Sequence, residues 1–249
     1  MEIAAEHPLA QAVVSAIRSG DVDGLRNLLM AHPDLARATI VDGKGIRRTL
    51  LHIVTDWPAH FPKAAATVAT LIAAGADPDA VVRVPGHDEM AETALHWAAS
   101  SDDVEAIDAL LDGGANIEAP GAIFTGGTAM SDAVVFAQWN AARRLLERGA
   151  RTTLWQAAAL GLTDRLAGYF AEAASPSSHD VTNALWHACR GGQPEAADYL
   201  LARGADLNWI GHDHKTPLDA AEESGAEQLV EWLRARGGKT ALDISTFLR

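Results

Sequence analysis

Two short runs of apolar residues at helical spacing stand between residues 92 and 118. The first run, residues 94–99, follows Thr93, whose hydroxyl can cap the free amides of a first helical turn. The second places its apolar residues on one face of a helix: Val104, Ile107, Leu110 and Leu111. Gly113 and Gly114 then end it, because glycine tolerates the left-handed backbone common at helix ends. The pattern predicts two helices joined by a turn at residues 100–103.

The same pattern returns along the chain, with Gly149 and Gly204 following Ser131 and Trp186 at the interval that separates Gly114 from His96. One such unit is too small to bury its apolar face alone, so neighbouring units must stack. The expected units are an N-terminal cap at 8–39, then 47–80, 92–119, 127–151, 152–175, 182–210, a C-terminal cap at 215–238 and a tail at 239–249.

The unit at residues 92–119 resembles the ankyrin repeat. The resemblance lies in the start Thr93-Ala94-Leu95-His96, the paired alanines 98–99 and the end Leu110-Leu111 to Gly114-Ala115-Asn116. It implies an all-α repeat solenoid: stacked helix–turn–helix units with short β-hairpin or loop connections, forming a single domain of roughly seven repeats of about 33 residues. It also implies that His52 and His96 serve hydrogen bonds inside the stack.

Some segments depart from that template. Trp155 and Trp186 stand where the family has the histidine of its start, and they are expected to reshape that part of the stack. Residues 56–62 lengthen one turn between helices, and residues 78–91 form a long connection in which 81–84 can become extended.

Composition narrows the function classes. The 249-residue chain has a formal net charge of −13, which disfavours nucleic acid and anionic membrane surfaces as partners. Its single cysteine, Cys189, excludes an internal disulfide and fits a cytoplasmic location. The N-terminus does not resemble a signal peptide, and no apolar run reaches about 18 residues, so no membrane span is expected.

A concave face built from connections and first-helix ends is the surface that the resemblance implies for a partner. Apolar and aromatic residues replace polar ones along it, and such patches are typical of binding sites. The predicted groove comprises Trp57, Phe124, Val135, Phe136, Leu160, Arg190, Trp209 and His212. A register error of one residue would instead turn Phe136 and Leu160 into the core. The resemblance favours a protein or peptide partner, by analogy of fold.

A second hypothesis is a small-molecule binding protein or an enzyme. It rests on an aromatic pocket of Trp155, Trp186, His187 and Arg190 and on the long connections. The residues favour a non-enzymatic module without deciding the question.

Residues with reactive side chains form no complete site. His187 and Cys189 are two apart on one helix and point to different sides, so Cys189 is expected in the core. The segments His212-Asp213-His214 and His87-Asp88-Glu89 lack the three or four ligands that zinc needs. We therefore expect no catalytic residue, metal or cofactor.

Overall fold

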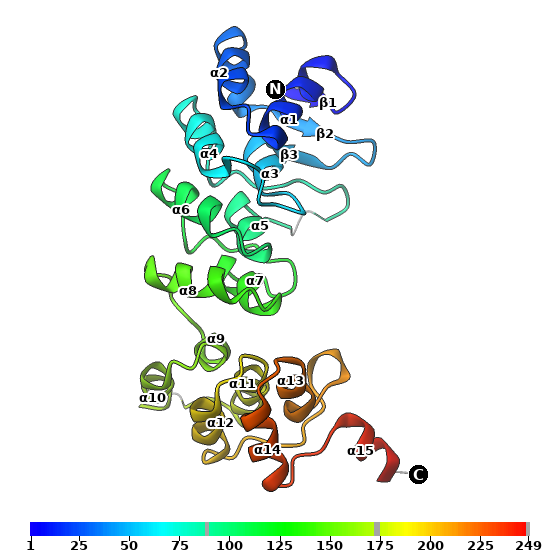
Figure 1. Cartoon of the computed structure of the whole chain (residues 1–249), viewed down its shortest axis with the longest axis vertical. Helices are drawn as coiled ribbons and strands as arrows, with labels where there is room; N and C mark the ends of the chain where they lie inside the picture. The colour runs from blue at the N-terminus through cyan, green and yellow to red at the C-terminus, as the bar shows by residue number, and fades with distance from the viewer. Residues whose placement is uncertain (88–89, 172–174, 248–249) are drawn as a thin grey trace. The chain divides into compact units, whose positions relative to one another are not determined.

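Helix pairs build the whole chain in the computed structural model, which describes residues 1–87, 90–171 and 175–247 (Figure 1). Contacts divide the chain into two compact units, unit 1 (Met1–Arg151) and unit 2 (Thr152–Arg249). The single continuous stack expected from the sequence stays a prediction, because each unit is defined by its own internal contacts. Each unit has its own buried core, with Leu110 and Leu145 buried in unit 1 and Leu200 in unit 2.

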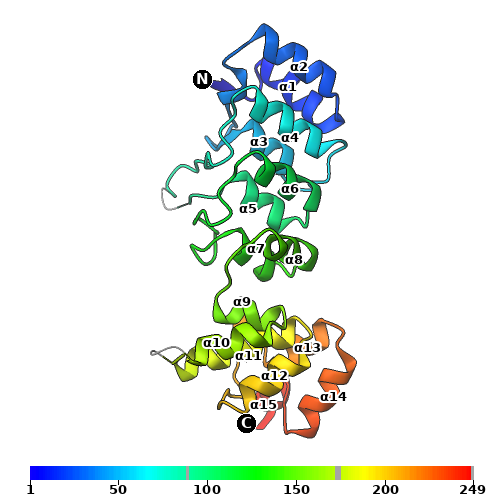
Figure 2. The same cartoon turned by 90° about the vertical axis from the view of Figure 1, so that its left-hand side faces the viewer.

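Unit 1 contains four helix pairs. They are α1 (Pro8–Ser19) with α2 (Val22–Ala31), α3 (Leu50–Thr55) with α4 (Ala64–Ala73), α5 (Ala94–Ser100) with α6 (Val104–Asp112), and α7 (Ala129–Val135) with α8 (Trp139–Glu147). The first helices pack on one another as an inner row, and the second helices form an outer row (Figures 1 and 2). The connections project from the side of the inner row (Figure 1). The predicted helix–turn–helix repeats are therefore present in unit 1.

A small sheet beside α1 was not predicted from the sequence. Strand β1 (Glu2–Ala4) pairs in parallel with β2 (Thr39–Val41), which pairs antiparallel with β3 (Arg47–Thr49). A one-turn 3₁₀ helix, η1 (Leu35–Arg37), precedes β2. The long connection after α4 extends this pairing, because Arg83 forms an antiparallel β-bridge with Arg47 and Val81 forms one with Thr93. The extended segment expected at 81–84 thus lies between two partners.

Unit 2 contains three helix pairs and a final helix. The elements are α9 (Leu154–Ala159), α10 (Thr163–Ala171), α11 (Ser178–Arg190), α12 (Pro194–Leu201), the 3₁₀ turn η2 (His212–His214), α13 (Pro217–Glu223), α14 (Glu227–Ala235) and α15 (Ala241–Phe247). Helix α11 packs between α9 and α13 (Figure 2). The expected tail forms α15, which begins where the Ala241 amide donates to Asp219 Oδ2 at 2.9 Å. Helix α11 also begins earlier than residue 182, because Ser177 caps it.

A hydrogen bond between an inner-helix ring nitrogen and a backbone carbonyl recurs between helix pairs in both units. The ring Nε2 atoms of His52 and His96 lie 3.1 and 3.4 Å from the carbonyl oxygens of Glu92 and Gly127. Each of these carbonyls belongs to the residue just before the threonine that caps the next inner helix. The structural role expected for the two histidines is confirmed. In unit 2, the indole Nε1 of Trp186 donates to the equivalent carbonyl, that of Lys215, at 3.0 Å.

The two tryptophans at the histidine place differ in what they do. Trp186 donates the hydrogen bond to the Lys215 carbonyl that joins two helix pairs, and its side chain is 1% exposed, so it is a core residue. Trp155 does not take the histidine's place at the helix cap. Gln156 makes that contact, with its Oε1 accepting the Thr153 amide at 2.8 Å. Thr153 is the N-cap of α9, so the third helical position, which His96 takes in α5, falls on Gln156 and not on Trp155.

Candidate functional site

An exposed aromatic pair marks the inner face of unit 1. Phe124, on the connection before α7, is 68% exposed, and Phe136, the C-cap of α7, is 41% exposed. Their ring centroids are 5.8 Å apart. Val135 beside them is half-buried, and Ile123 is a further exposed apolar residue that the sequence did not single out. Phe136 therefore lies at the surface, and these residues form one apolar patch.

Buried groups hold the connection that carries Phe124. Glu92 Oε1 accepts the Ile123 amide at 3.2 Å, and Glu92 Oε2 accepts the Trp97 indole N–H at 3.0 Å. Gly121 has a φ of +140°, and a Cβ there would lie 2.3 Å from the Ala91 carbonyl oxygen, so only glycine allows this close approach. The connection is thus fixed to the backbone before α5, and the position of Phe124 follows from it.

A second carboxyl lies beneath this patch. Asp132 of α7 is 1% exposed, and its Oδ2 has no hydrogen-bond partner among the described residues. Burial, with the neighbouring charge of Glu92, raises the pKa of Asp132 to about 8. Burial also raises the pKa of Glu92, against the opposing effect of the Trp97 hydrogen bond. Both carboxyls therefore favour their protonated forms more than exposed carboxyls do.

Trp57 lies elsewhere in unit 1. It begins the lengthened turn between α3 and α4 and is 81% exposed. That turn reaches toward the next pair, since the ring Nε2 of His60 lies 2.9 Å from the Ser101 carbonyl oxygen. Among the ring contacts of the described residues, none joins Trp57 to Phe124 or Phe136. Trp57 is an exposed aromatic separate from the Phe124–Phe136 pair.

Unit 2 brings together several residues that the sequence assigned to two different sites. We call them the histidine–tryptophan cluster: Trp155, His179, Trp186, His187, Trp209 and His212. The His187 ring lies 4.6 Å from Trp155, 5.0 Å from Trp186 and 5.3 Å from His212, between centroids. Trp209 contacts both His212 and His179. The groove residues Trp209 and His212 therefore adjoin the predicted pocket residues.

Burial divides the cluster into a floor and a rim. Trp186 and His187 are buried, Trp155 and Trp209 are half-buried, and His179 and His212 are exposed. The 3₁₀ turn η2 presents His212, and its Nε2 lies 2.8 Å from Asn183 Oδ1 of α11. The cluster therefore presents aromatic edges from α9, α11 and the 207–215 connection around a buried imidazole.

Two imidazoles of the cluster, those of His187 and His212, have lowered pKa values. Burial, together with the nearby His212 and Arg190, lowers the pKa of His187 to about 3. Burial also lowers the pKa of His212, although Asp213 acts in the opposite direction. His187 Nδ1 is buried without a hydrogen-bond partner among the residues that the structure describes. Most buried polar atoms have partners, so this ring nitrogen is unusual.

Arg190 is the permanent positive charge beside the cluster. Its guanidinium carbon lies 5.6 Å from the centroid of the Trp186 ring, and the side chain is half-buried. Within the described ranges, Arg190 forms no ion pair with a carboxylate, whereas Arg144, Arg148 and Lys215 all do. This cation is therefore held against an aromatic ring with its hydrogen-bond donors available.

The remaining sequence predictions concern Leu160 and the reactive side chains. Leu160 is the half-buried C-cap of α9. Cys189 is fully buried, and burial raises the pKa of its thiol, so its predicted core role is confirmed. Among the described residues, no three His, Cys, Asp or Glu side chains gather as metal ligands; Asp88 and Glu89 lie outside them. No described helix is both long and apolar enough to span a bilayer.

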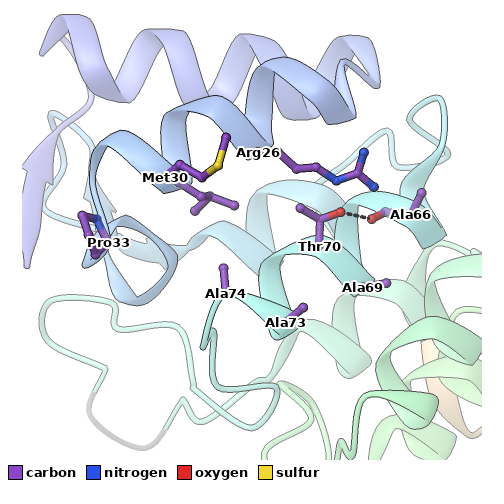
Figure 3. A pocket seen from close by; sticks show the side chains of 9 residues that line it. Arg26, Met30, Pro33, Ala66, Ala69, Thr70, Ala73 and Ala74 are labelled. Atoms are coloured by element: carbon purple, nitrogen blue, oxygen red, sulfur yellow. Dashed lines mark hydrogen bonds between the residues drawn. The ribbon is translucent and has the colours of Figure 1, made fainter.

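A hollow lies on the opposite, outer side of unit 1, between α2 and α4 (Figure 3). Its volume is about 860 Å³, and Met30, which is 72% exposed, lines it with Ala66, Ala69 and Ala73 of α4. The Thr70 hydroxyl in its wall donates to the Ala66 carbonyl at 2.8 Å, so it is already satisfied. Ligand sites usually add several convergent polar groups, and this hollow offers chiefly Arg26.

Comparison with known families and structures identifies the repeat. Residues 59–154 and 154–244 match the family model described as ankyrin repeats (3 copies). The crystal structure of the human ASB11 ankyrin repeat domain superposes with a TM-score of 0.51 at 20% identity, covering 92% of this chain and 98% of that one. At this identity the similarity concerns the fold alone. A search of curated proteins finds no match.

Proposed function

Because the chain belongs to the ankyrin repeat family, whose members are generally protein–protein interaction modules, we propose that it binds a segment of a partner protein. The proposed surface is the face formed by the inner helices and their connections, the concave face of the family. Fold alone does not assign this surface, so the proposal rests on side chains.

The observation that carries the proposal is the position of four exposed large apolar side chains, three in unit 1 and one in unit 2. Ile123, Phe124, Phe136 and Ile210 lie on connections or at the end of an inner helix. Exposed aromatic and aliphatic groups that lie together are typical of binding surfaces. Glu92 and Gly121 fix the connection that presents Phe124, so little ordering of that connection is needed when a partner binds.

The hypothesis of a small-molecule site has less support from the geometry. Trp186 and His187 form a buried floor, and Trp186 already donates its indole N–H to Lys215. Trp155 and Arg190 are half-buried, and His212, which the groove hypothesis also uses, contacts Trp186 and His187 of the predicted pocket. We therefore assign the pocket residues and the groove residues Arg190, Trp209 and His212 to one recognition surface of unit 2.

A selection from a random peptide library tests the proposal. We expect the full chain to enrich peptides with apolar anchors, because Phe124 and Phe136 offer an apolar surface. For peptides whose binding depends on unit 1, the double variant Phe124→Ser/Phe136→Ser should weaken binding at least tenfold. Peptide affinities are measured by fluorescence anisotropy.

The matched control is Met30→Ser, which removes a still more exposed apolar residue from the outer side of the same unit. It should leave peptide affinity within twofold. Circular dichroism should show unchanged helix content in all variants, because the substituted side chains are exposed. If no peptide is enriched, or if Met30→Ser abolishes binding, the proposed surface is wrong.

A further inference from the structure

We propose that the histidine–tryptophan cluster and Arg190 form a site for one acidic side chain, Asp or Glu, of the bound segment. This inference rests on the proposed function, because it names the chemistry that the inner face of unit 2 would recognise. Its evidence is independent of the Phe124–Phe136 pair: a buried imidazole, a ring of aromatic groups and an arginine without an ion pair.

Charge selects the class of ligand. Arg190 is a fixed cation without a carboxylate partner among the described residues, and it lies beside Trp186, His187 and His212. A cationic side chain of a partner would be repelled by it. A carboxylate would form charge-assisted hydrogen bonds with the guanidinium, which are the stronger kind in proteins. Arg190 carries this positive charge in a chain whose net charge is −13, and Asp213 is the negative charge that acts on the neighbouring His212.

The surroundings select a single negative charge. Burial lowers the pKa of His187 and of His212, and the ammonium of Lys215 is paired with Glu223, so Arg190 is the permanent positive charge beside the cluster that lacks a carboxylate partner among the described residues. A phosphorylated residue carries roughly −1.5 to −2 and is usually bound by several cations. A carboxylate of Asp or Glu therefore matches the site better than a phosphate does.

The buried part of the cluster supplies a second indication of a ligand. His187 is 5% exposed, and its Nδ1 lacks a hydrogen-bond partner among the described residues. Aromatic rings of Trp155, Trp186 and His212 surround it. The half-buried rings of Trp155 and Trp209 lie at the rim, where they can contact an apolar residue next to the acidic one. The expected motif is therefore an acidic residue adjacent to an apolar or aromatic residue.

The test uses the random peptide library on the full chain and on three variants. Wild-type protein should enrich Asp or Glu at one position beside an apolar residue, although its negative charge would by itself favour basic peptides. Arg190→Gln should lose this enrichment, and Arg190→Lys should keep part of it, because lysine retains the charge but not the planar donor pair. Arg203→Gln is the matched control, since Arg203 also stacks on an aromatic ring, that of Tyr199, in the same unit.

Titrations then isolate the contact. Changing the acidic residue of the leading peptide to its amide should weaken binding to wild-type protein at least tenfold, and to Arg190→Gln by less than twofold. Such a difference is the coupling that a double-mutant cycle measures. Equal losses on both proteins, or peptides that bind the cluster without an acidic position, would overturn the carboxylate site while the proposed function stands.

Two other outcomes are decisive. A phosphoserine peptide that binds more tightly than its Asp counterpart would contradict the assignment to a carboxylate. Failure of the full chain to enrich any peptide would contradict the proposed function itself, and the acidic site with it. Unchanged thermal unfolding of Arg190→Gln would show that a loss of enrichment does not come from misfolding.

Discussion

Replacing Trp186 with alanine is expected to lower the free energy of unfolding by about 3 to 5 kcal/mol, the range for large buried aromatic residues. Trp186 is 1% exposed in the core of unit 2, so its removal leaves a cavity among residues that cannot fully collapse. It also leaves the Lys215 carbonyl without the indole donor that links α11 to the cap of α13. Urea unfolding followed by circular dichroism at 222 nm measures the loss.

Two further variants separate packing from the hydrogen bond. Trp186→His restores the imidazole that makes the same bond at His52 and His96, so its loss should be smaller than that of Trp186→Ala. Trp155→Ala removes a half-buried indole that makes no such bond to the next pair, and it should also cost less. A loss below about 1 kcal/mol for Trp186→Ala, the size of an ordinary substitution, would contradict the structural role of this residue.

Replacing Asp132 with asparagine is expected to remove a pH dependence of stability. The pKa of Asp132 rises from 3.8 to about 8 on folding, because the carboxyl is buried beside Glu92. Above pH 4 the unfolded chain releases this proton while the folded chain retains it, so stability falls as pH rises toward 8. The fall amounts to at most about 1.4 kcal/mol per pH unit. Urea unfolding at pH 5, 6 and 7 should show Asp132→Asn gaining stability relative to wild type.

Buried histidines give the free energy of unfolding the opposite pH dependence at acidic pH. Burial lowers the pKa of His52 and His96 from 6.5 to about 4, so their contribution to stability is complete above pH 6.5 and is lost as pH falls toward 4. Wild type and Asp132→Asn both contain these histidines, so the difference between their free energies of unfolding isolates the effect of the Asp132 carboxyl. That difference should grow by roughly 2 to 3 kcal/mol from pH 5 to pH 7.

The control for charge removal is Asp34→Asn, an exposed aspartate in the same unit that makes no side-chain cap bond. Its stability relative to wild type should change little over the same pH range. A constant difference between wild type and Asp132→Asn from pH 5 to pH 7 would show that Asp132 is ionised in the folded state, contrary to its burial.

The helix pairs were predictable because each unit repeats the same local signals. Within one short segment, Thr93 caps a helix, His96 makes the hydrogen bond to the next repeat, and Gly114 follows the end of the second helix. Pairing between distant residues left no such signal. Glu2–Ala4 and Thr39–Val41 are short strands whose partners are far apart in sequence, so the N-terminal sheet was missed. Ser177 and Asp180 form a capping box that looked like a loop because serines and a proline surround it.

The binding surface was predictable only in part. The start Thr152-Thr153-Leu154 assigned Trp155 to the histidine place, whereas Thr153 caps α9 and gives the cap contact to Gln156. Trp186 kept the histidine's hydrogen bond and lies buried as the floor of the histidine–tryptophan cluster, which the sequence did not indicate. The contacts that join His212 of one connection to His187 of α11 depend on how that connection folds back, which repeat spacing does not encode.

Amide hydrogen exchange of the full chain, with and without a library-selected peptide, tests most directly whether the inner face is the recognition surface. Bound peptide should slow exchange in the connections at 119–128 or 207–215 and in the inner helices beside them, since these carry the exposed apolar groups and Arg190. Exchange in α2, α4 and α6 should not change. Protection confined to those outer helices, around the hollow beside Met30, would contradict recognition through the inner face.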